Sequence, residues 1–449
     1  MKFIKHTALF IVMILFLGCK KEDKSIVITP DNYHNSMDQI INVMIHDIFS
    51  PPVASRIFAY PNVAAYEIIA TNNKDFKSLS GQLSGLTPIP NYDKSKGHLN
   101  VQLAALVAYI DVSKEMIFSE EPIVKYRDSL YTKWENTNKV EFNNAKEYGL
   151  EVASHIKKWL SKDHYKETRS MPKYTIRTND PSKWQPTPPA YMDGIEPHWS
   201  KIRTFVIDSA NQFAPPPPPK YSLDKGSLFY KELKEVYDIG NDIVKKGDTC
   251  VGIKTARFWD CNPYVSVTHG HMMYAVKKIT PGAHWIGIAK IACKKANYNF
   301  DQTVYAYTKT ALAIADGFIS CWDEKYRSNV VRPETLINKY IDQNWKPLLQ
   351  TPPFPEYSSG HSVVSGAAAV VLTDVFGDNF QFDDDTEMQF GIPVRSFNSF
   401  NQAANEAAMS RMYGGIHYRS AVENGILQGR SLGHYIVSKL EMNRVKRKL

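Results

Sequence analysis

Three short motifs in the C-terminal half of the chain contain side chains that can bind an oxyanion. The first, KYRSNVVRP, starts at Lys325 and places Arg332 directly before a proline, the second is the SSGH sequence at 358–361, and the third, SRMYGGIH, runs from Ser410 to His417. Each motif alone has an ordinary explanation, because a lysine and an arginine usually form a solvated surface and two glycines usually form a turn. Their occurrence together suggests a shared role.

If the three motifs converge between apolar helices, Lys325, Arg332 and Arg411 place three cations in one site. Each pair of like charges would cost about 4 kcal/mol at a separation of about 4 Å and an effective dielectric constant of about 20. Such a site needs an anion, and the planar guanidinium group suits an anion with several oxygens. We therefore predict a bound tetrahedral oxyanion, either phosphate or vanadate.

The second motif, part of FPEYSSGH at 354–361, also fits a simpler role. Ser358 or Ser359 can cap the apolar helix that follows, because a serine hydroxyl accepts a hydrogen bond from a free backbone N–H group. A helix that begins at Gly360 also presents N–H groups and the positive end of its dipole to an anion. The sequence leaves both roles open.

Helical periodicity dominates the chain and strand-type alternation is scarce, so we predict an all-α fold. The segments with apolar residues at helical spacing are 36–48, 52–71, 97–118, 123–136, 139–162, 226–247, 285–297, 301–325, 360–376, 400–413 and 420–441. The segment 301–325 is apolar on most faces and is expected at the centre of the molecule. Lys325 would end this helix, and Pro333 would begin the next, since proline is tolerated in a first turn. Arg411 would lie at the end of a helix that the glycine pair at 414–415 breaks.

The helical pattern breaks up between about Met171 and Ser222. This segment includes the proline run 215–219, which favours an extended polyproline conformation, and its aromatic residues suggest that it wraps over a surface. Those aromatic residues are Trp184, Tyr191 and Trp199. We therefore predict an N-terminal helical region at 35–224, with a Pro-rich wrapping segment at 171–222, and a C-terminal helical region at 225–449 that carries the chemistry.

The composition is that of a folded globular protein. The chain has 449 residues, of which 43% are hydrophobic, and this is sufficient for a large core. The net charge of +8 is spread along the chain, with NRVKRKL at the end as the only short basic cluster, so no nucleic-acid binding is expected. The cysteines beyond the N-terminus lack CxxC spacing, which argues against a zinc site, and they can form up to two disulfides or remain buried thiols. They are Cys250, Cys261, Cys293 and Cys321.

The N-terminus resembles the signal peptide of a bacterial lipoprotein. A basic start precedes the apolar segment 8–17, which is too short to span a bilayer comfortably, although a membrane-anchoring or buried helix is the alternative. The FLGC sequence that follows is similar to a lipobox, with Phe16 in place of the usual leucine. The resemblance implies a signal peptide at 1–18, a lipidated Cys19 and a polar spacer at 19–34. We expect an exported protein, periplasmic or at the cell surface, that is held at the membrane only by this lipid anchor.

The three oxyanion motifs resemble the three-part signature of the type 2 phosphatidic acid phosphatase superfamily, which includes acid phosphatases and vanadium-dependent haloperoxidases. The resemblance covers roughly residues 250–440 and implies an α-helical bundle. It implies a cofactor, vanadate, whose site phosphate can also occupy, and a set of residues that bind the oxyanion: Lys325, Arg332, Ser359, Gly360 and Arg411. It also implies that His417 bonds covalently to the oxyanion and that His361 is the acid–base residue.

Residues outside the signature bear on the choice of reaction. Trp322 and Phe354 are similar to the vanadium chloroperoxidase pattern and would line a halide pocket, although aromatic residues that simply pack between helices are an equal alternative. The block FWDCNPYVSVTHGH resembles bacterial haloperoxidases and makes Tyr264 a candidate for the same pocket. His269 and His271 are interpreted as structural or surface residues, because alternate residues do not share a helix face.

The resemblance favours a haloperoxidase that oxidises a halide, most readily iodide, with hydrogen peroxide to hypohalous acid. His361 would take a proton from the peroxide and Lys325 would polarise the bound peroxide. The resemblance implies that vanadium keeps its oxidation state, so no haem, flavin or redox cysteine is required. Two alternatives remain. An acid phosphatase would use His417 as its nucleophile, and a non-catalytic lipoprotein would only bind phosphate.

Two positions depart from the family pattern. Ser358 stands where the family usually has proline, which alters the local hydrogen bonding. Ala421 stands where the family often has an aspartate, four positions after His417. A histidine bonded through one nitrogen usually needs its second nitrogen held, so we expect another group to orient His417, for example a backbone carbonyl.

Overall fold

The computed structural model describes residues 24–269, 272–275 and 277–443 and confirms a fold built almost entirely of helices. The N-terminal helices are α1 (Pro30–His46), α2 (Pro51–Asn72), α3 (Val101–Glu115), α4 (Glu120–Thr137), α5 (Lys139–Leu160) and α6 (Tyr165–Ser170). The C-terminal helices are α7 (Leu228–Lys246), α8 (Val251–Phe258), α9 (Pro281–Lys295), α10 (Phe300–Ser328), α11 (Pro333–Tyr340), α12 (Gly360–Phe376), α13 (Phe400–Tyr413) and α14 (Arg419–Lys439). The predicted signal peptide, Cys19, His271 and the basic residues after Asn443 lie outside the described residues.

Strands are short and form two hairpins in the described part of the chain. Strand β1 (Ser266–His269) pairs antiparallel with β2 (Met272–Ala275), and β3 (Phe382–Asp384) pairs antiparallel with β4 (Arg395–Phe397). The scarcity of strand patterns in the sequence is therefore confirmed.

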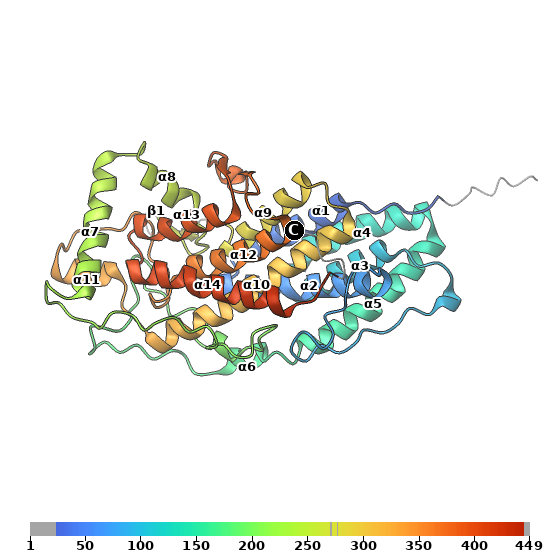
Figure 1. Cartoon of the computed structure of the whole chain (residues 1–449), viewed down its shortest axis with the longest axis horizontal. Helices are drawn as coiled ribbons and strands as arrows, with labels where there is room; N and C mark the ends of the chain where they lie inside the picture. Colours follow the sequence, from blue (N-terminus) through green and yellow to red (C-terminus); the bar gives the residue numbers. More distant parts are fainter. Residues whose placement is uncertain (1–23, 270–271, 276, 444–449) are drawn as a thin grey trace, which may run out of the picture.

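Helix α10 is the central element, as its sequence predicts. Asn299 caps its start in a capping box with Gln302, Asn329 ends it in the left-handed conformation, and every residue from Thr303 to Trp322 is buried. Figure 1 shows α10 in the middle of an elongated molecule, with α3, α4 and α5 towards one end and α7 and α11 at the other. Lys325 consequently lies on the last turn of a helix that is buried in the core over most of its length.

Helices α12 and α14 approach each other closely because glycines face the contact. A Cβ atom on Gly429 of α14 would lie 2.0 Å from the carbonyl oxygen of Val363 of α12, and one on Gly366 would lie 2.7 Å from the carbonyl oxygen of Ile426. The backbone N–H of Ser359 donates to the carbonyl of Ala421 at 3.0 Å, so the starts of the two helices are also tied together. This contact fixes the N-terminus of α12, where the second motif lies.

The segment 171–222 wraps over the C-terminal end of α10. The N–H of Trp184 donates to the carbonyl of Asn329 at 3.1 Å, and the N–H of Ile195 donates to the carbonyl of Pro353 at 3.0 Å. Trp184 and Trp199 are buried, whereas Tyr191 is 63% exposed, so two of the three predicted aromatic residues pack into the interior.

The boundaries differ from the sequence expectations where a proline begins a helix. Helix α1 starts at Pro30 rather than near residue 36, and α9 starts at Pro281 rather than near residue 285, because Thr29 and Thr280 cap them. The predicted start of a helix at Pro333 is confirmed by α11. Helices α6 and α8 were not predicted, since six and eight residues are too few for a clear period.

One continuous hydrophobic core includes side chains from both sides of residue 224, from Ile26 to Met442. The division of the chain at that point stays a prediction. Among the described helices, none combines the length and the hydropathy that a bilayer span requires.

Candidate oxyanion site

The structure brings the three motifs together at the ends of four helices. Lys325 comes from the last turn of α10, Arg332 is the N-cap residue of α11, Gly360 is the first residue of α12, and Arg411 lies in the last turn of α13. His417 follows in the loop before α14. The side chains of the three cations and of His417 are buried, with at most 3% of their surface exposed.

Ser359 has the capping role that the second motif predicts. It is the N-cap residue of α12, and its hydroxyl accepts a weak hydrogen bond of 3.4 Å from the N–H of Ser362. Ser358, at the position of the family's proline, donates to Gln428 at 2.7 Å, and Gln428 in turn donates to Ser320 at 3.0 Å. The departure from proline therefore adds a buried hydrogen-bond chain between α10, α12 and α14.

A carboxylate orients His417, and it lies just before the second motif. Oε1 of Glu356 is 2.7 Å from Nδ1 of His417 and also accepts the N–H of Tyr418 at 2.9 Å. Another group therefore orients His417, as expected, and it is a carboxylate rather than the backbone carbonyl given as an example. The sequence signal for it is an acidic residue two positions before the serine pair.

The hydrogen bonds of His417 define its tautomer. Arg332 has only donors, and its Nη1 lies 3.1 Å from Nε2 of His417, so Nε2 accepts and the ring proton lies on Nδ1, facing Glu356. Burial, together with Arg332, Lys325 and Arg411, lowers the pKa of His417 well below its usual value. Nε2 is therefore unprotonated, and its lone pair, which accepts from Arg332 here, is the one that can bond to an electrophilic centre.

Lys325 is held by carbonyl groups rather than by a carboxylate. Its Nζ donates to the carbonyls of Pro355, Glu356 and Ser358 at 3.0, 3.0 and 2.6 Å. Burial lowers the pKa of Lys325 to about 8, and the like charge of Arg332 contributes to this shift. An anion beside Lys325 would oppose both effects.

The two arginines are tied to backbone carbonyls on their far sides. Arg332 donates to Phe354 from Nε at 2.9 Å and to Ile416 from Nη1 at 2.8 Å, while Arg411 donates to the carbonyl of Trp259 from Nη2 at 2.6 Å. Burial lowers the pKa of both guanidinium groups, that of Arg332 to about 10. These bonds fix the orientation of the guanidinium planes before any ligand binds.

Several buried polar atoms at the site have no hydrogen-bond partner in the described structure. They include Nη2 of Arg332, Nε2 of His361, Oγ of Ser362 and Oε2 of Glu356. Nη2 of Arg332 and the hydroxyl of Ser362 are donors, and unpaired buried donors are rare in folded proteins, so these two atoms indicate a ligand with acceptor oxygens. The ring of His361 is held by the backbone carbonyl of Trp259, which leaves Nε2 as its free nitrogen.

A cavity lies at this site. Its lining residues include Gly360, His361, Arg411, His417, Trp322 and Phe354. The two rings are 4.9 Å apart, and Nζ of Lys325 lies 5.1 Å from the centre of the Phe354 ring. Burial and the charge of Arg411 lower the pKa of His361 well below its usual value, so a neutral imidazole faces this cavity.

Tyr264 is placed differently from its prediction. Its hydroxyl interacts with Ser50 and lies near Glu196 and Arg169, and the cavity is lined instead by its neighbours Asn262 and Pro263. His269 lies on β1 rather than on a helix, and its side chain is outside the description.

Comparisons with known proteins agree with this geometry. A family model for the VCPO second helical-bundle domain matches residues 305–444. The crystal structure of the first bacterial vanadium-dependent iodoperoxidase is 62% identical in sequence, with a TM-score of 0.91, and the alignment covers 95% of this chain and 100% of that one. A search of curated proteins found no match.

More distant structures share the fold. A holo-type bacterial vanadium-dependent chloroperoxidase is 16% identical with a TM-score of 0.62, over 90% of this chain and 92% of that one. The apo-type chloroperoxidase is 15% identical with a TM-score of 0.63, over 87% of this chain and 94% of that one.

Proposed function

The chain belongs to the vanadium-dependent haloperoxidases, and we propose that the halide it oxidises is iodide. Its reaction is the oxidation of a halide by hydrogen peroxide to hypohalous acid, with vanadate as cofactor. The support for iodide is the 62% identity, over nearly the whole of both chains, to a bacterial iodoperoxidase. Iodide is also the halide that is easiest to oxidise.

The residues at the site fit vanadate. The three cations are buried together, and the unpaired Nη2 of Arg332 needs an acceptor. We propose that Lys325, Arg332, Ser359, Gly360 and Arg411 hold the oxyanion oxygens and that Nε2 of His417 is the ligand of the metal. Bound vanadate supplies a Lewis acid that activates peroxide without a change in its own oxidation state.

His361 would be the acid–base residue. Its Nε2 has no partner and lines the cavity, and its neutral form can accept a proton from hydrogen peroxide. A bound oxyanion would offset the charge of Arg411 and raise the pKa of His361 towards a value useful near neutral pH. The carbonyl of Trp259 fixes the ring so that the proton is taken at Nε2.

Trp322 and Phe354 would form the halide-facing wall. Phe354 lies between two cations, with Arg332 5.1 Å and Lys325 5.1 Å from its ring centre, and Nε1 of Trp322 is tied to the carbonyl of Ile195 at 3.1 Å. This leaves apolar ring surface towards the cavity. Such a surface suits iodide, which is large and weakly hydrated, better than the polar alcohol of a phosphoester.

The halide preference is tested by comparing the kcat/KM values for the three halides. The vanadate-loaded protein is given peroxide with iodide, bromide or chloride, and the vanadate-free protein is given a chromogenic phosphoester. We expect the highest kcat/KM for iodide. A higher kcat/KM for bromide or chloride would contradict the iodide proposal, and phosphoester hydrolysis with no halide oxidation in the loaded protein would favour the phosphatase alternative.

We also propose that the protein is a lipoprotein anchored at the membrane through Cys19. The support is the lipobox-like FLGC sequence after a short apolar segment. Expression of the full chain in a bacterial host should place it in the membrane fraction, and Cys19→Ser should release it or leave the signal peptide uncut. An unchanged membrane fraction and unchanged mass in Cys19→Ser would contradict the lipid anchor.

A further inference from the structure

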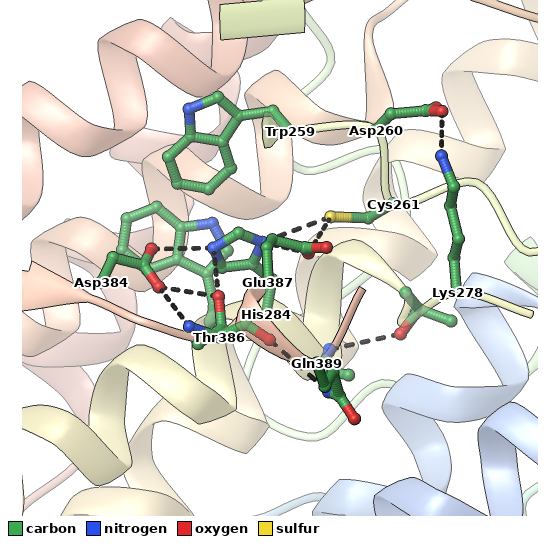
Figure 2. A network of polar contacts seen from close by, with 12 residues as sticks. Trp259, Asp260, Cys261, Lys278, His284, Asp384, Thr386, Glu387 and Gln389 are labelled. Atoms are coloured by element: carbon green, nitrogen blue, oxygen red, sulfur yellow. Dashed lines mark hydrogen bonds and ion pairs between the residues drawn. The ribbon is translucent and has the colours of Figure 1, made fainter. Parts of the chain in front are cut away.

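A second buried polar cluster lies beside the oxyanion site and has the opposite chemical character. Figure 2 shows Cys261 and Glu387 on one side of the His284 ring, with Asp384 and Thr386 on the other. All three of Cys261, His284 and Glu387 are buried, with at most 2% of their surface exposed. Thiol, imidazole and carboxylate are ligands for a cation, so this cluster is distinct from the cationic vanadate site.

The donor atoms are spaced as a tetrahedral metal site requires. Sγ of Cys261 is 3.3 Å from Nδ1 of His284 and 3.6 Å from Oε1 of Glu387, and Nδ1 is 3.2 Å from Oε1. Bonds of about 2.0–2.3 Å around a tetrahedral zinc separate its ligand atoms by about 3.3–3.6 Å. A single ion therefore fits between these three atoms with little movement of the side chains.

The opposite edge of the imidazole, which carries Nε2, has the arrangement typical of a metal-binding histidine. Nε2 of His284 lies 2.8 Å from Oδ2 of Asp384 and 2.9 Å from Oγ1 of Thr386, and Thr386 donates to Oδ1 of Asp384 at 2.7 Å. A carboxylate that accepts the second ring N–H fixes the tautomer in which Nδ1 carries the free lone pair. The ring of Trp259 stacks on His284 at 4.5 Å and holds its plane.

Charge balance also permits a divalent cation. His284 lies between two acidic side chains, with Nε2 2.8 Å from Oδ2 of Asp384 and Nδ1 3.2 Å from Oε1 of Glu387. A cation bound by Cys261, His284 and Glu387 would therefore be surrounded by groups that can carry compensating negative charge.

We propose that Cys261, His284 and Glu387 bind one Zn²⁺ ion as three of its four tetrahedral ligands. The mixed sulfur, nitrogen and oxygen ligands favour zinc over calcium or magnesium, which prefer oxygen alone. The ligands come from three separate segments of the chain, which explains why the lack of CxxC spacing led us to expect no zinc site. Carboxylate and histidine ligands placed far apart in sequence leave no local pattern.

The zinc ion would position two residues of the oxyanion site. It would fix the segment after α8, where Trp259 lies two residues before the ligand Cys261. The carbonyl of Trp259 accepts from Arg411 at 2.6 Å and also holds the ring of His361. Loss of zinc should therefore loosen the vanadate site without removing any of its ligands.

The first test measures metal content directly. The wild-type chain is loaded with zinc, dialysed and analysed by inductively coupled plasma mass spectrometry, with vanadate present in parallel. We expect one zinc per chain whether or not vanadium is bound. Cobalt substitution should give a thiolate-to-cobalt charge-transfer absorption band. Absence of stoichiometric zinc together with absence of that band would overturn the proposal, as would preferential binding of a different metal.

Variants with a matched control locate the ion. Cys261→Ser and Glu387→Gln should lose zinc and weaken vanadate binding. Cys293→Ser removes a buried thiol on α9 that is not a proposed ligand, so this variant should keep both its zinc and its vanadate affinity. If Cys261→Ser fails to fold, the cobalt spectrum of wild type and of Cys293→Ser still decides the question, since both keep the ligand set. Full zinc retention by a folded Cys261→Ser variant would contradict the assignment.

Discussion

The imidazole of His417 is clamped between Glu356 and Arg332, with Nδ1 2.7 Å from Oε1 of Glu356 and Nε2 3.1 Å from Nη1 of Arg332. Because arginine can only donate, the pair of contacts leaves the lone pair on Nε2. Burial raises the pKa of Glu356 to about 8, and Arg332 and the N–H of Tyr418 oppose that rise. Glu356 thus prepares His417 as a ligand before vanadate arrives.

Replacing Glu356 should weaken vanadate binding more than it impairs the loaded enzyme. Glu356→Ala removes the acceptor for both Nδ1 of His417 and the N–H of Tyr418, and loss of such an orienting group typically weakens metal affinity by about 10–100-fold. Glu356→Gln keeps a carbonyl oxygen and should retain most of the affinity. The measurement is the vanadate Kd from reconstitution of activity, and an unchanged Kd in folded Glu356→Ala would show that His417 does not need this partner.

His361→Ala should retain vanadate but lose most of the turnover. Loss of a positioned acid–base group typically lowers kcat by about 10²–10⁴-fold. Neither nitrogen of His361 bonds to another oxyanion-site side chain, so the vanadate Kd should change little. Full peroxide-dependent iodide oxidation by His361→Ala would rule out the acid–base role.

The unfolding free energy of the vanadate-free protein should depend on the titration of Lys325 at alkaline pH. Its pKa falls from 10.5 to about 8 on folding, so between these values the unfolded chain binds more protons than the folded one. The free energy of unfolding therefore gains a contribution of about 3 kcal/mol as the pH rises through this window, and loses it as the pH falls through 8. The comparison is with Lys325→Met, which lacks this contribution.

Urea unfolding of wild type and Lys325→Met at several values between pH 7 and pH 10.5 provides the measurement. The difference in unfolding free energy should shift in favour of wild type with rising pH. A difference that stays constant would mean that Lys325 titrates normally in the folded chain.

Trp322→Phe should alter halide binding without loss of vanadate. The change removes the bond from Nε1 to the carbonyl of Ile195 and shortens the wall that faces the cavity. We expect a higher KM for iodide with a smaller change in kcat, since this wall contacts the halide and not the vanadate. Unchanged steady-state constants for iodide would place the halide elsewhere.

Gly429→Ala should prevent stable folding of the C-terminal bundle. The added Cβ would lie 2.0 Å from the carbonyl oxygen of Val363, so α12 and α14 would have to separate. Overpacking of this kind typically costs about 1–3 kcal/mol or more, and here the obstacle is backbone. Gly226→Ala, where nothing lies within 4 Å, is the matched control, and equal Tm values for the two variants would contradict the close helix contact.

The sequence predicted the parts of the site that lie within short motifs. Lys325 at a helix end, Ser359 as an N-cap and Arg411 before the glycine pair all follow from local rules of helix start and stop. Glu356 was missed because its role depends on His417, which is distant in sequence and reaches it only through the fold. The His284 cluster was missed for the same reason, since its members come from the segment after α8, from α9 and from the turn after β3, which only tertiary packing brings together.

The short helices and the place of Tyr264 also depend on tertiary contacts. Helix α8 has too few residues for a period, and Tyr264 follows a loop whose path is set by Asn262 and Gln350 rather than by a repeating pattern. Local propensity does not encode such paths.

Vanadate titration of peroxide-dependent iodide oxidation tests the central claim most directly. Wild type, prepared free of vanadium, should gain activity in proportion to vanadate up to one equivalent per chain, and His417→Ala should stay inactive at the same vanadate concentrations. Iodide oxidation by the vanadium-free wild type, or equal activation of His417→Ala, would contradict the account.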